Sequence, residues 1–154
     1  MAPHERFKIY IAAYLVLKKK NQILLSRRFN TGFSDGDYSL VAGHLDGGET
    51  AKQSIIRESK EEANISLKPK DLTVTHIQHR IGPDREYIDI YLSAEKWTGK
   101  IKVMEPNKCD DLRWFDLKKL PKNLIPSVKH ALKCIEKGEF YGEFGWDNQQ
   151  SLKK

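Results

Sequence analysis

Three glutamates share one side of a helix that the sequence predicts. Glu58, Glu61 and Glu62 follow Arg57, and side chains three and four positions apart on a helix face the same way. Like charges at these spacings destabilise an isolated helix by about 0.2–0.5 kcal/mol per pair, so the cluster calls for a counter-charge. Carboxylate oxygens suit a hard divalent cation such as Mg²⁺, which often binds substrate phosphates as well. A solvated helix surface with Arg57 and Lys60 nearby is the alternative interpretation.

A glycine-containing loop, residues 43–49, comes directly before this helix. Glycine lets a backbone approach a ligand closely. Loop and helix together read Gly43, five residues, Glu49, seven residues, and then Arg-Glu-Ser-Lys-Glu-Glu-Ala-Asn-Ile at 57–65. This pattern closely resembles the Nudix box, G-x5-E-x7-R-E-U-x-E-E-x-G-U, in which U is a bulky aliphatic residue. All six glycine, glutamate and arginine positions before the final glycine match, which chance would produce in roughly one chain in 10⁵.

Two positions depart from the box. Ser59 stands where the box has an aliphatic residue, and we expect looser packing there without the loss of a ligand. Asn64 replaces the final glycine, and asparagine enters the left-handed backbone region more easily than most side chains. The resemblance extends from a predicted strand at Phe7 to a predicted helix after Pro126. The chain looks like the MutT-like branch of the family, which hydrolyses nucleoside triphosphates.

The resemblance implies a role for each residue of the box. The three glutamates would bind Mg²⁺, with Mn²⁺ as a substitute, and the Ala42 carbonyl would add a backbone ligand. Water would attack a phosphorus of a diphosphate linkage, with Glu58 or a residue outside the box as the base. Arg57 would hold Glu49 or Glu61 in place by a forked hydrogen bond. A bound cation would neutralise phosphate charge and lower the pKa of bound water.

Substrate contacts are predicted from positions outside the helix. Arg28 ends the second predicted strand, where related enzymes hold a phosphate arginine, and His44 follows the first glycine of the box. Related enzymes also take a carboxylate from a loop across the cleft. Glu105 is the candidate that we favour for this position, and Asp110 and Asp111 are the alternatives.

Recognition of the base is left open by the sequence. Some MutT-like enzymes use an asparagine just before the last helix, and Asn123 lies near that place. Trp97, Trp114 and Tyr87 are able to stack on a base, although packing within the sheet is the simpler interpretation.

The elements that must position these residues follow from hydrophobic periodicity and turn signals. Strands are predicted at 7–17, 22–28, 38–42, 72–81, 87–97 and 112–115, and helices at 50–63 and 126–138. Thr50 or Glu49 can cap the first helix, with Gln53 at capping-box spacing from Thr50, and Asn64 stands where a left-handed residue ends it. We expect one domain over 1–154 in the α+β or mixed α/β class: a Nudix-type α/β/α sandwich with a mixed central sheet.

Composition excludes several classes of protein. Of 154 residues, 39% are hydrophobic and 10% aromatic, too many for a disordered chain, and no apolar run approaches the ~20 residues of a membrane span. The net charge of +6 allows a polyphosphate partner. Residues 1–6 lack the order of a signal peptide, and the two cysteines form no metal-binding or disulfide motif, so we expect a cytoplasmic protein.

Hydrolysis of a nucleoside diphosphate-linked compound is the activity that these residues favour. We expect a nucleoside triphosphate to give monophosphate and pyrophosphate. ADP-ribose, dinucleoside polyphosphates and RNA 5′ ends are the alternative substrates, and a nucleotide-binding sensor is the alternative class of function. The partner is then a small nucleotide rather than a membrane or, RNA 5′ ends excepted, a nucleic acid. The protein would be a monomer or a homodimer.

Overall fold

The computed structural model describes residues 4–148, so Met1–Pro3 of the N-terminal stretch discussed above lie outside the described residues. The elements in chain order are β1 (Tyr10–Lys19), β2 (Gln22–Arg28), β3 (Tyr38–Ser39), β4 (Ala42–His44), α1 (Ala51–Ala63), the 3₁₀ turn η1 (Pro69–Asp71), β5 (Thr73–Ile81), β6 (Glu86–Ala94), β7 (Cys109–Asp116), α2 (Pro126–Glu136), β8 (Tyr141–Phe144) and the 3₁₀ turn η2 (Trp146–Asn148). None of the helices within residues 4–148 has the length and apolarity needed to cross a membrane.

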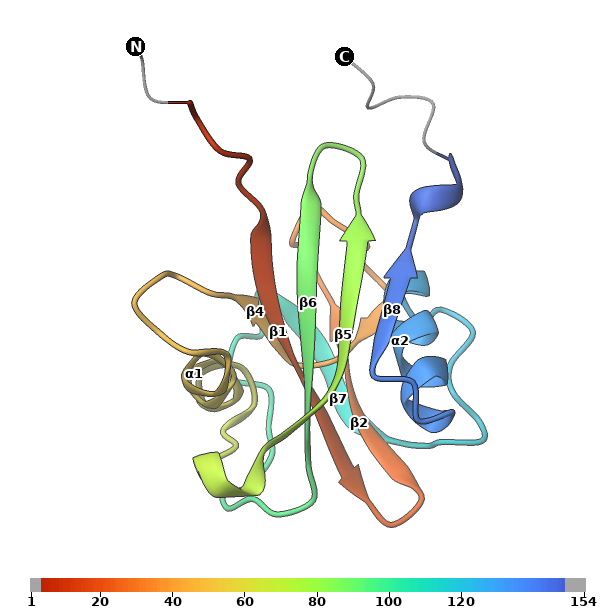
Figure 1. The fold of residues 1–154 in the computed structure, drawn as a ribbon. Coiled ribbons are helices and arrows are strands. Elements are labelled where there is room, and N and C mark those ends of the chain that lie inside the picture. Colours follow the sequence, from red (N-terminus) through yellow and green to blue (C-terminus); the bar gives the residue numbers. More distant parts are fainter. Residues whose placement is uncertain (1–3, 149–154) are drawn as a thin grey trace.

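A mixed sheet forms the middle layer of the molecule, with α1 and α2 on opposite sides of it (Figure 1). Its strand order is β3-β2-β1-β6-β5-β8, with β4 added to β1 and β7 added to β2. The pairs β1/β6 and β5/β8 are parallel, and the other strand pairs are antiparallel. The expected mixed sheet between two helices is therefore confirmed.

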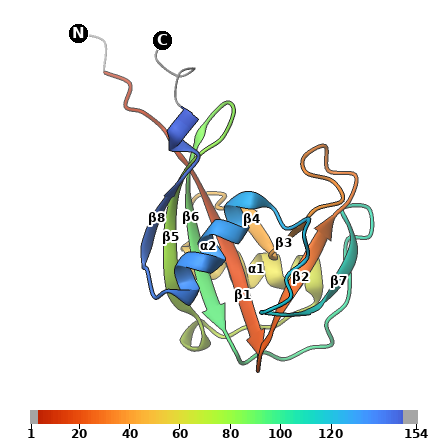
Figure 2. The same ribbon diagram turned by 90° about the vertical axis from the view of Figure 1, so that its right-hand side faces the viewer.

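The hairpin of β1 and β2 opens a gap in the sheet. The two strands pair only beside their turn, at Lys18 with Ile23 and Lys19 with Gln22. Further from the turn, β1 pairs with β4 and β6, while β2 pairs with β3 and β7. Figure 2 shows the two strands diverging from the hairpin. Because each strand finds other partners for its backbone groups, a cleft can open between them without unpaired hydrogen bonds.

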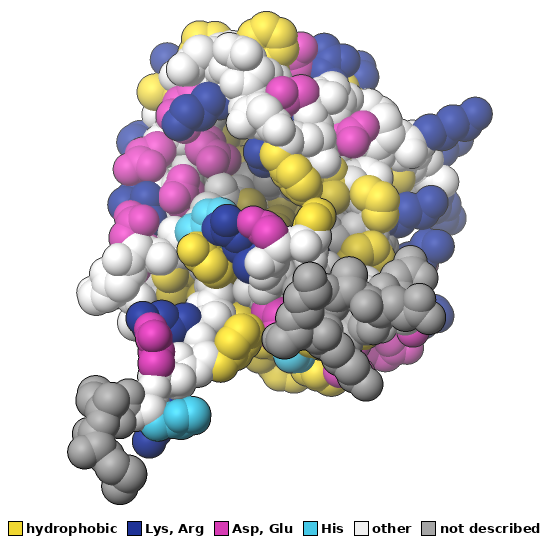
Figure 3. All heavy atoms as spheres, turned by 90° about the horizontal axis from the view of Figure 1, so that it is seen from above, with side chains coloured by type: hydrophobic (Ala, Val, Ile, Leu, Met, Phe, Trp, Pro, Cys, Tyr) yellow, Lys and Arg dark blue, Asp and Glu magenta, His cyan; other side chains and the backbone are white. Residues whose placement is uncertain are grey.

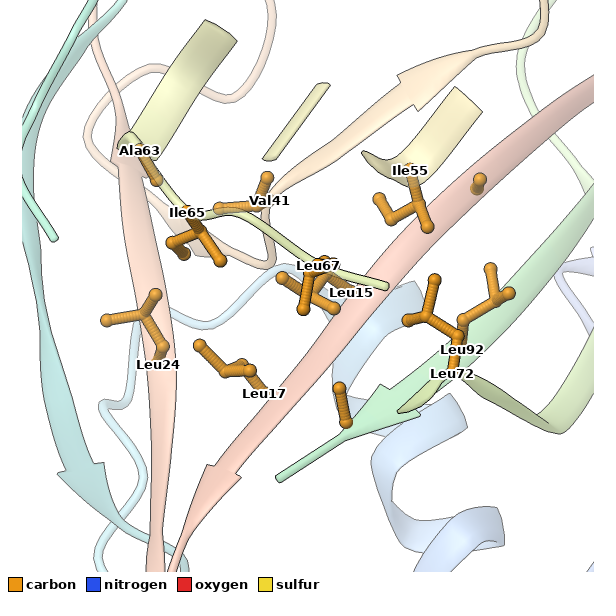
Figure 4. Close-up of a cluster of buried hydrophobic side chains, with 12 residues drawn as sticks. Leu15, Leu17, Leu24, Val41, Ile55, Ala63, Ile65, Leu67, Leu72 and Leu92 are labelled. Atoms are coloured by element: carbon orange, nitrogen blue, oxygen red, sulfur yellow. The ribbon is translucent and has the colours of Figure 1, made fainter. Parts of the chain in front are cut away.

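Alternation along β1 divides the hydrophobic core in two. Leu15 and Leu17 are buried on the side of α1, together with Ile55 and Ala63 of that helix (Figure 4). Val16 points the other way and joins the cluster under α2. This period of two is the pattern of a strand that is covered on both faces. Both helices are thereby fixed to the strand that forms one wall of the cleft.

The ends of α1 are defined as the sequence predicts. The side chain of Thr50 accepts a hydrogen bond from the Gln53 backbone, and the Gln53 side chain accepts one in return from the Thr50 backbone. Asn64 ends the helix in the left-handed conformation, at φ 56°. Ser59 is fully buried, and its hydroxyl donates to the carbonyl of Ile55 at 2.5 Å, which satisfies the hydroxyl inside the core.

Some element boundaries differ from the predicted ones. β1 begins at Tyr10 rather than Phe7, and the predicted strand 38–42 is two strands, because the chain crosses there from β2 to β1. No strand is predicted from the sequence at β8, which has only four residues, one of them Gly142. A Cβ atom at Gly142 would lie 3.1 Å from the ring of His76, so the close packing there favours glycine. Because glycine is a weak strand former, the sequence at this position does not indicate a strand.

Candidate active site

A cavity of about 700 Å³ lies in the cleft between β1 and β2. That volume is within the range of small-molecule sites. Its lining includes all seven residues predicted to bind metal or substrate: Arg28, Ala42, His44, Glu58, Glu61, Glu62 and Glu105. Seen from above, acidic side chains gather beside the hollow part of the surface (Figure 3). Elements that are far apart in the sequence thus bring the predicted residues to one place.

Gly43 makes room for a carboxylate of α1. A Cβ atom at this position would lie 2.2 Å from Oε1 and 2.3 Å from Cδ of Glu58, far inside normal contact. Gly43 pairs with Ala13 in the β1/β4 ladder, so its backbone is held in place. Glycine is therefore needed at position 43 because a larger side chain would collide with Glu58. Its backbone does not require glycine, because φ at this position is not positive.

Arg57 organises the acidic side chains around it. Its Nη2 and Nε atoms donate to the two carboxylate oxygens of Glu49 at 2.8 and 3.3 Å, which is a forked contact. Its Nη1 donates to Glu58 at 2.9 Å and to Glu61 at 3.4 Å. The hydrogen bonds from Arg57 are the main cause of a lowered pKa at Glu49. Arg57 thus joins the loop to the helix, and it does not itself line the cavity.

Glu62 is the most strongly perturbed acid of the helix. Burial raises its pKa to about 8, and repulsion from Glu58 adds to the shift. The Ala42 backbone N–H hydrogen-bonds to the Glu62 carboxylate, and the positive charge of Arg28 acts on it in the same direction, both lowering the pKa. Burial also raises the pKa of Glu58. Arg57 pairs with Glu58, whereas no ion pair within the described residues compensates the charged form of Glu62.

The donor set fits a divalent cation. Within residues 4–148, no three acidic, histidine or cysteine side chains are already arranged to hold an ion. The donors at α1 are nevertheless carboxylate oxygens, which Mg²⁺ prefers, and partly buried Glu62 makes no ion pair in the described part of the chain. A cation among Glu58, Glu61 and Glu62 would offset both effects that raise the pKa of Glu62, the loss of hydration on burial and the repulsion from Glu58.

The loop that carries Glu105 is attached to the end of α1. The backbone N–H groups of Lys102 and Met104 donate to the carbonyls of Ala63 and Glu62, at 3.2 and 3.1 Å. The Asn64 side chain donates to the Lys100 carbonyl at 2.9 Å. These bonds satisfy carbonyls at the helix end and bring Glu105 near enough to act electrostatically on Glu62.

Arg28 and His44 lie on opposite walls of the cavity. The guanidinium of Arg28 donates to the Phe33 carbonyl and to the Thr31 hydroxyl, at 2.7 and 3.0 Å, so the loop after β2 holds its orientation. His44 comes from β4, opposite Ala12 of β1. The alternatives to Glu105 are engaged elsewhere: Asp110 pairs with Arg27 and Asp111 with Arg113.

The remaining candidates for base recognition do not line the cavity. Trp97 and Trp114 pack against each other, with ring centroids 5.5 Å apart, at the edge of the core under α1. The Asn123 side chain donates to the Gly36 carbonyl at 2.7 Å. Tyr87 lies against the guanidinium of Arg80.

Sequence reasoning missed Arg80 and its partner. Arg80 lines the cavity, and its Nε and Nη2 atoms donate to the fully buried carboxylate of Asp89 at 2.6 and 3.2 Å. Tyr14 lines the same wall, and burial raises the pKa of its hydroxyl. An available signal was Asp89 itself, because a charged residue inside an apolar strand needs a partner.

Comparison with known proteins gives a consistent result. The family model of the NUDIX domain matches residues 7–136. The ADP-ribose pyrophosphatase of Methanocaldococcus jannaschii is 30% identical over 122 residues, which are 77% of this chain and 70% of that protein. The NAD-capped RNA hydrolase NudC of Stutzerimonas stutzeri is 29% identical over 107 residues, 70% of this chain but only 36% of that protein.

Solved structures show the same fold. The MutT NUDIX hydrolase from Burkholderia pseudomallei matches with a TM-score of 0.76 and 24% identity, over 82% of this chain and 98% of that one. A bifunctional NMN adenylyltransferase/ADP ribose pyrophosphatase from Francisella tularensis, complexed with AMP and a Mn ion, matches with a TM-score of 0.67 and 20% identity, over 89% of this chain and 43% of that one.

Proposed function

The chain belongs to the NUDIX domain family, and from that premise we propose that it hydrolyses the diphosphate linkage of a nucleotide with the help of a divalent cation, Mg²⁺ or Mn²⁺. The observation that carries this proposal is the position of Glu58, Glu61 and Glu62 in the wall of the cavity, where Glu62 is partly buried and makes no ion pair in the described part of the chain. Binding alone does not need such a cluster. A nucleotide sensor would be better served by basic groups, because they attract phosphate without repelling one another.

Each residue of the site has a task in this proposal. The cation, when bound, would neutralise phosphate charge and lower the pKa of a bound water. The three glutamates would hold it, and the Ala42 carbonyl is a further candidate ligand. Arg57 positions Glu58 through the contact at 2.9 Å and ties Glu49 to the helix. Arg28 would bind a phosphate from the opposite wall. Glu58 and Glu105 are the candidate bases.

A nucleoside triphosphate is the minimal substrate that we propose. Water would attack the β phosphorus, the bond from that phosphorus to the α–β bridging oxygen would break, and the nucleoside monophosphate would leave with that oxygen. The products are monophosphate and pyrophosphate. Arg28 favours this reading because it stands where it could hold the phosphate chain.

A larger diphosphate compound is the second candidate. The relatives named as ADP-ribose pyrophosphatase and NAD-capped RNA hydrolase favour it. The match spans only about a third of the latter protein, so its substrate does not transfer directly.

A product assay tests both candidates. The protein is incubated with Mg²⁺ and ATP, GTP, ADP-ribose, diadenosine tetraphosphate or 5′-triphosphate RNA, and products are separated by ion exchange. In ¹⁸O-water the label should appear in pyrophosphate when a triphosphate is cut. Label in the monophosphate would place the attack at the α phosphorus instead. Cleavage of ADP-ribose without cleavage of any triphosphate selects the second candidate, and no cleavage of any compound refutes the proposal.

A further inference from the structure

Three aromatic rings and two arginines meet at one edge of the cavity. Tyr10, His44 and Tyr87 have ring centroids 5.9–6.1 Å apart. The guanidinium of Arg80 lies 3.9 Å from the centre of the Tyr87 ring, and that of Arg85 lies 4.6 Å from the centre of the Tyr10 ring. We refer to these five residues as the aromatic rim. They come from β1, β4, β5 and β6 and from the turn between β5 and β6.

The register of the sheet makes the rim continuous with the cavity. Tyr14, Ala12 and Tyr10 lie on one face of β1, and the first two line the cavity. Tyr10 is the next side chain on that face, about 7 Å beyond Ala12. His44 and Arg80 line the cavity and belong to the rim. A ligand that fills the cavity and continues along β1 would reach the ring of Tyr10.

Several side chains of the aromatic rim are exposed to solvent rather than packed into the core. Tyr10 is 48% exposed, and the side chain of Arg85 is 41% exposed. His44 is also exposed, whereas Tyr87 is partly buried and supports the others. Arg85 pairs with Asp84, so its guanidinium is oriented without being buried. Exposed aromatic rings beside guanidinium groups are the kind of surface on which nucleobases stack.

We propose that the aromatic rim binds an unpaired nucleobase on the part of the substrate that lies beyond the cleaved diphosphate. The inference deepens the proposed function and rests on it. A triphosphate fills the cavity and is cut, and a substrate with a second base gains affinity from the rim. The second base could belong to a dinucleoside polyphosphate or to the 5′ end of an RNA, and the chemistry of stacking is shared by both.

The test compares substrates with one base and with two. We measure kcat/KM for ATP and for diadenosine tetraphosphate with the wild type and with Tyr10→Leu. Tyr10 is suitable because it lies outside the cavity lining. Stacking on one aromatic side chain predicts a loss of about tenfold for the two-base substrate. The value for ATP should stay within about twofold. Tyr10→Phe, which keeps the ring, should restore the two-base value.

A matched control is offered by Tyr141, a second exposed tyrosine, on β8 and outside the cavity lining. Tyr141→Leu should leave both kcat/KM values unchanged. An equal loss for ATP and diadenosine tetraphosphate in Tyr10→Leu, or no loss for either, overturns the inference.

A binding experiment separates this inference from the proposed function. In EDTA, where no hydrolysis is expected, titration calorimetry compares ATP with diadenosine tetraphosphate, and AMP with the 5′-phosphorylated dinucleotide of adenosine. In one of the two pairs the two-base compound should bind more tightly than the one-base compound, and Tyr10→Leu should remove the difference. This result is expected even if no compound is hydrolysed, in which case only the proposed function fails. A gain for diadenosine tetraphosphate indicates a dinucleoside polyphosphate, and a gain for the dinucleotide indicates an RNA 5′ end. Equal binding within both pairs refutes the rim.

Discussion

Substituting Gly43 by alanine tests the link between the glycine loop and the acidic helix. The added methyl group would lie 2.2 Å from Oε1, 2.3 Å from Cδ and 2.5 Å from Cγ of Glu58, so at least 1 Å of movement is needed to reach ordinary contact. The backbone at Gly43 is open to alanine because its φ is not positive. The strain therefore falls on Glu58, which must leave its place beside Arg57. Overpacking of this kind costs about 1–3 kcal/mol of unfolding free energy.

The effect on hydrolysis should exceed the effect on stability. Misplacing a catalytic group by about 1 Å costs on the order of 100-fold in rate, so Gly43→Ala should lower kcat about 100-fold. The assay is steady-state hydrolysis with Mg²⁺, together with urea unfolding. Gly138→Ala is the control: its φ is +72° and no atom lies within 4 Å of the added Cβ, so it should lose about 1 kcal/mol of stability and no activity.

A double mutant checks the cause. In a Glu58→Ala background the space for the methyl group exists, so Gly43→Ala should cost little further stability, and the two changes should not be additive. Full additivity in unfolding free energy, or a Gly43→Ala enzyme with wild-type kcat, would refute the reasoning.

The other predictions concern α1 and its end. Arg57→Lys should lower kcat more than it raises KM, because lysine cannot make the forked contact with Glu49; a change in KM alone would place Arg57 on the substrate. Glu62→Gln should nearly abolish hydrolysis. Because the folded-state pKa of about 8 lies above the ordinary 4.5, ionisation of Glu62 destabilises the fold. In EDTA the wild-type Tm should therefore fall relative to that of Glu62→Gln as pH rises from about 5 to about 8. Addition of Mg²⁺ should raise the Tm of the wild type more than that of Glu62→Gln. Asn64→Ala should cost about 1–2 kcal/mol in urea unfolding, since alanine at φ 56° is strained and the bond to Lys100 is lost; equal stability would contradict this.

The local features of α1 were predictable because short-range rules set them. Thr50 and Gln53 form the capping box at the spacing that the sequence shows, and Asn64 takes the left-handed conformation. The side-chain bond from Asn64 to Lys100 was not predictable, because it joins residues 36 positions apart. Asn64 therefore does more than replace a glycine, since glycine could take the same φ but could not hold the loop of Glu105.

The walls of the cleft depend on strand register, which the sequence leaves open. Tyr10 faces Tyr87 and Ala12 faces Asp89 only because β1 and β6 are parallel and aligned in this register. A shift by one residue would turn each side chain to the other face of the sheet. For this reason the aromatic rim could not be predicted from a sequence motif, although Tyr87 was among the residues considered for stacking on a base.

The buried pair of Arg80 and Asp89 joins the fold to the site. Such a pair is weak support for stability, since desolvation of two charges offsets much of their attraction. In this protein the pair holds a guanidinium at the junction of the cavity and the rim, with Tyr87 beneath it at 3.9 Å. Asp89 occupies two of its donor atoms and fixes the plane of the group, which leaves Nη1 outside that fork. A rigid, oriented cation between the aromatic rim and the cavity that we propose to bind phosphate would help to bind a nucleotide, which gives the pair a reason that stability alone does not.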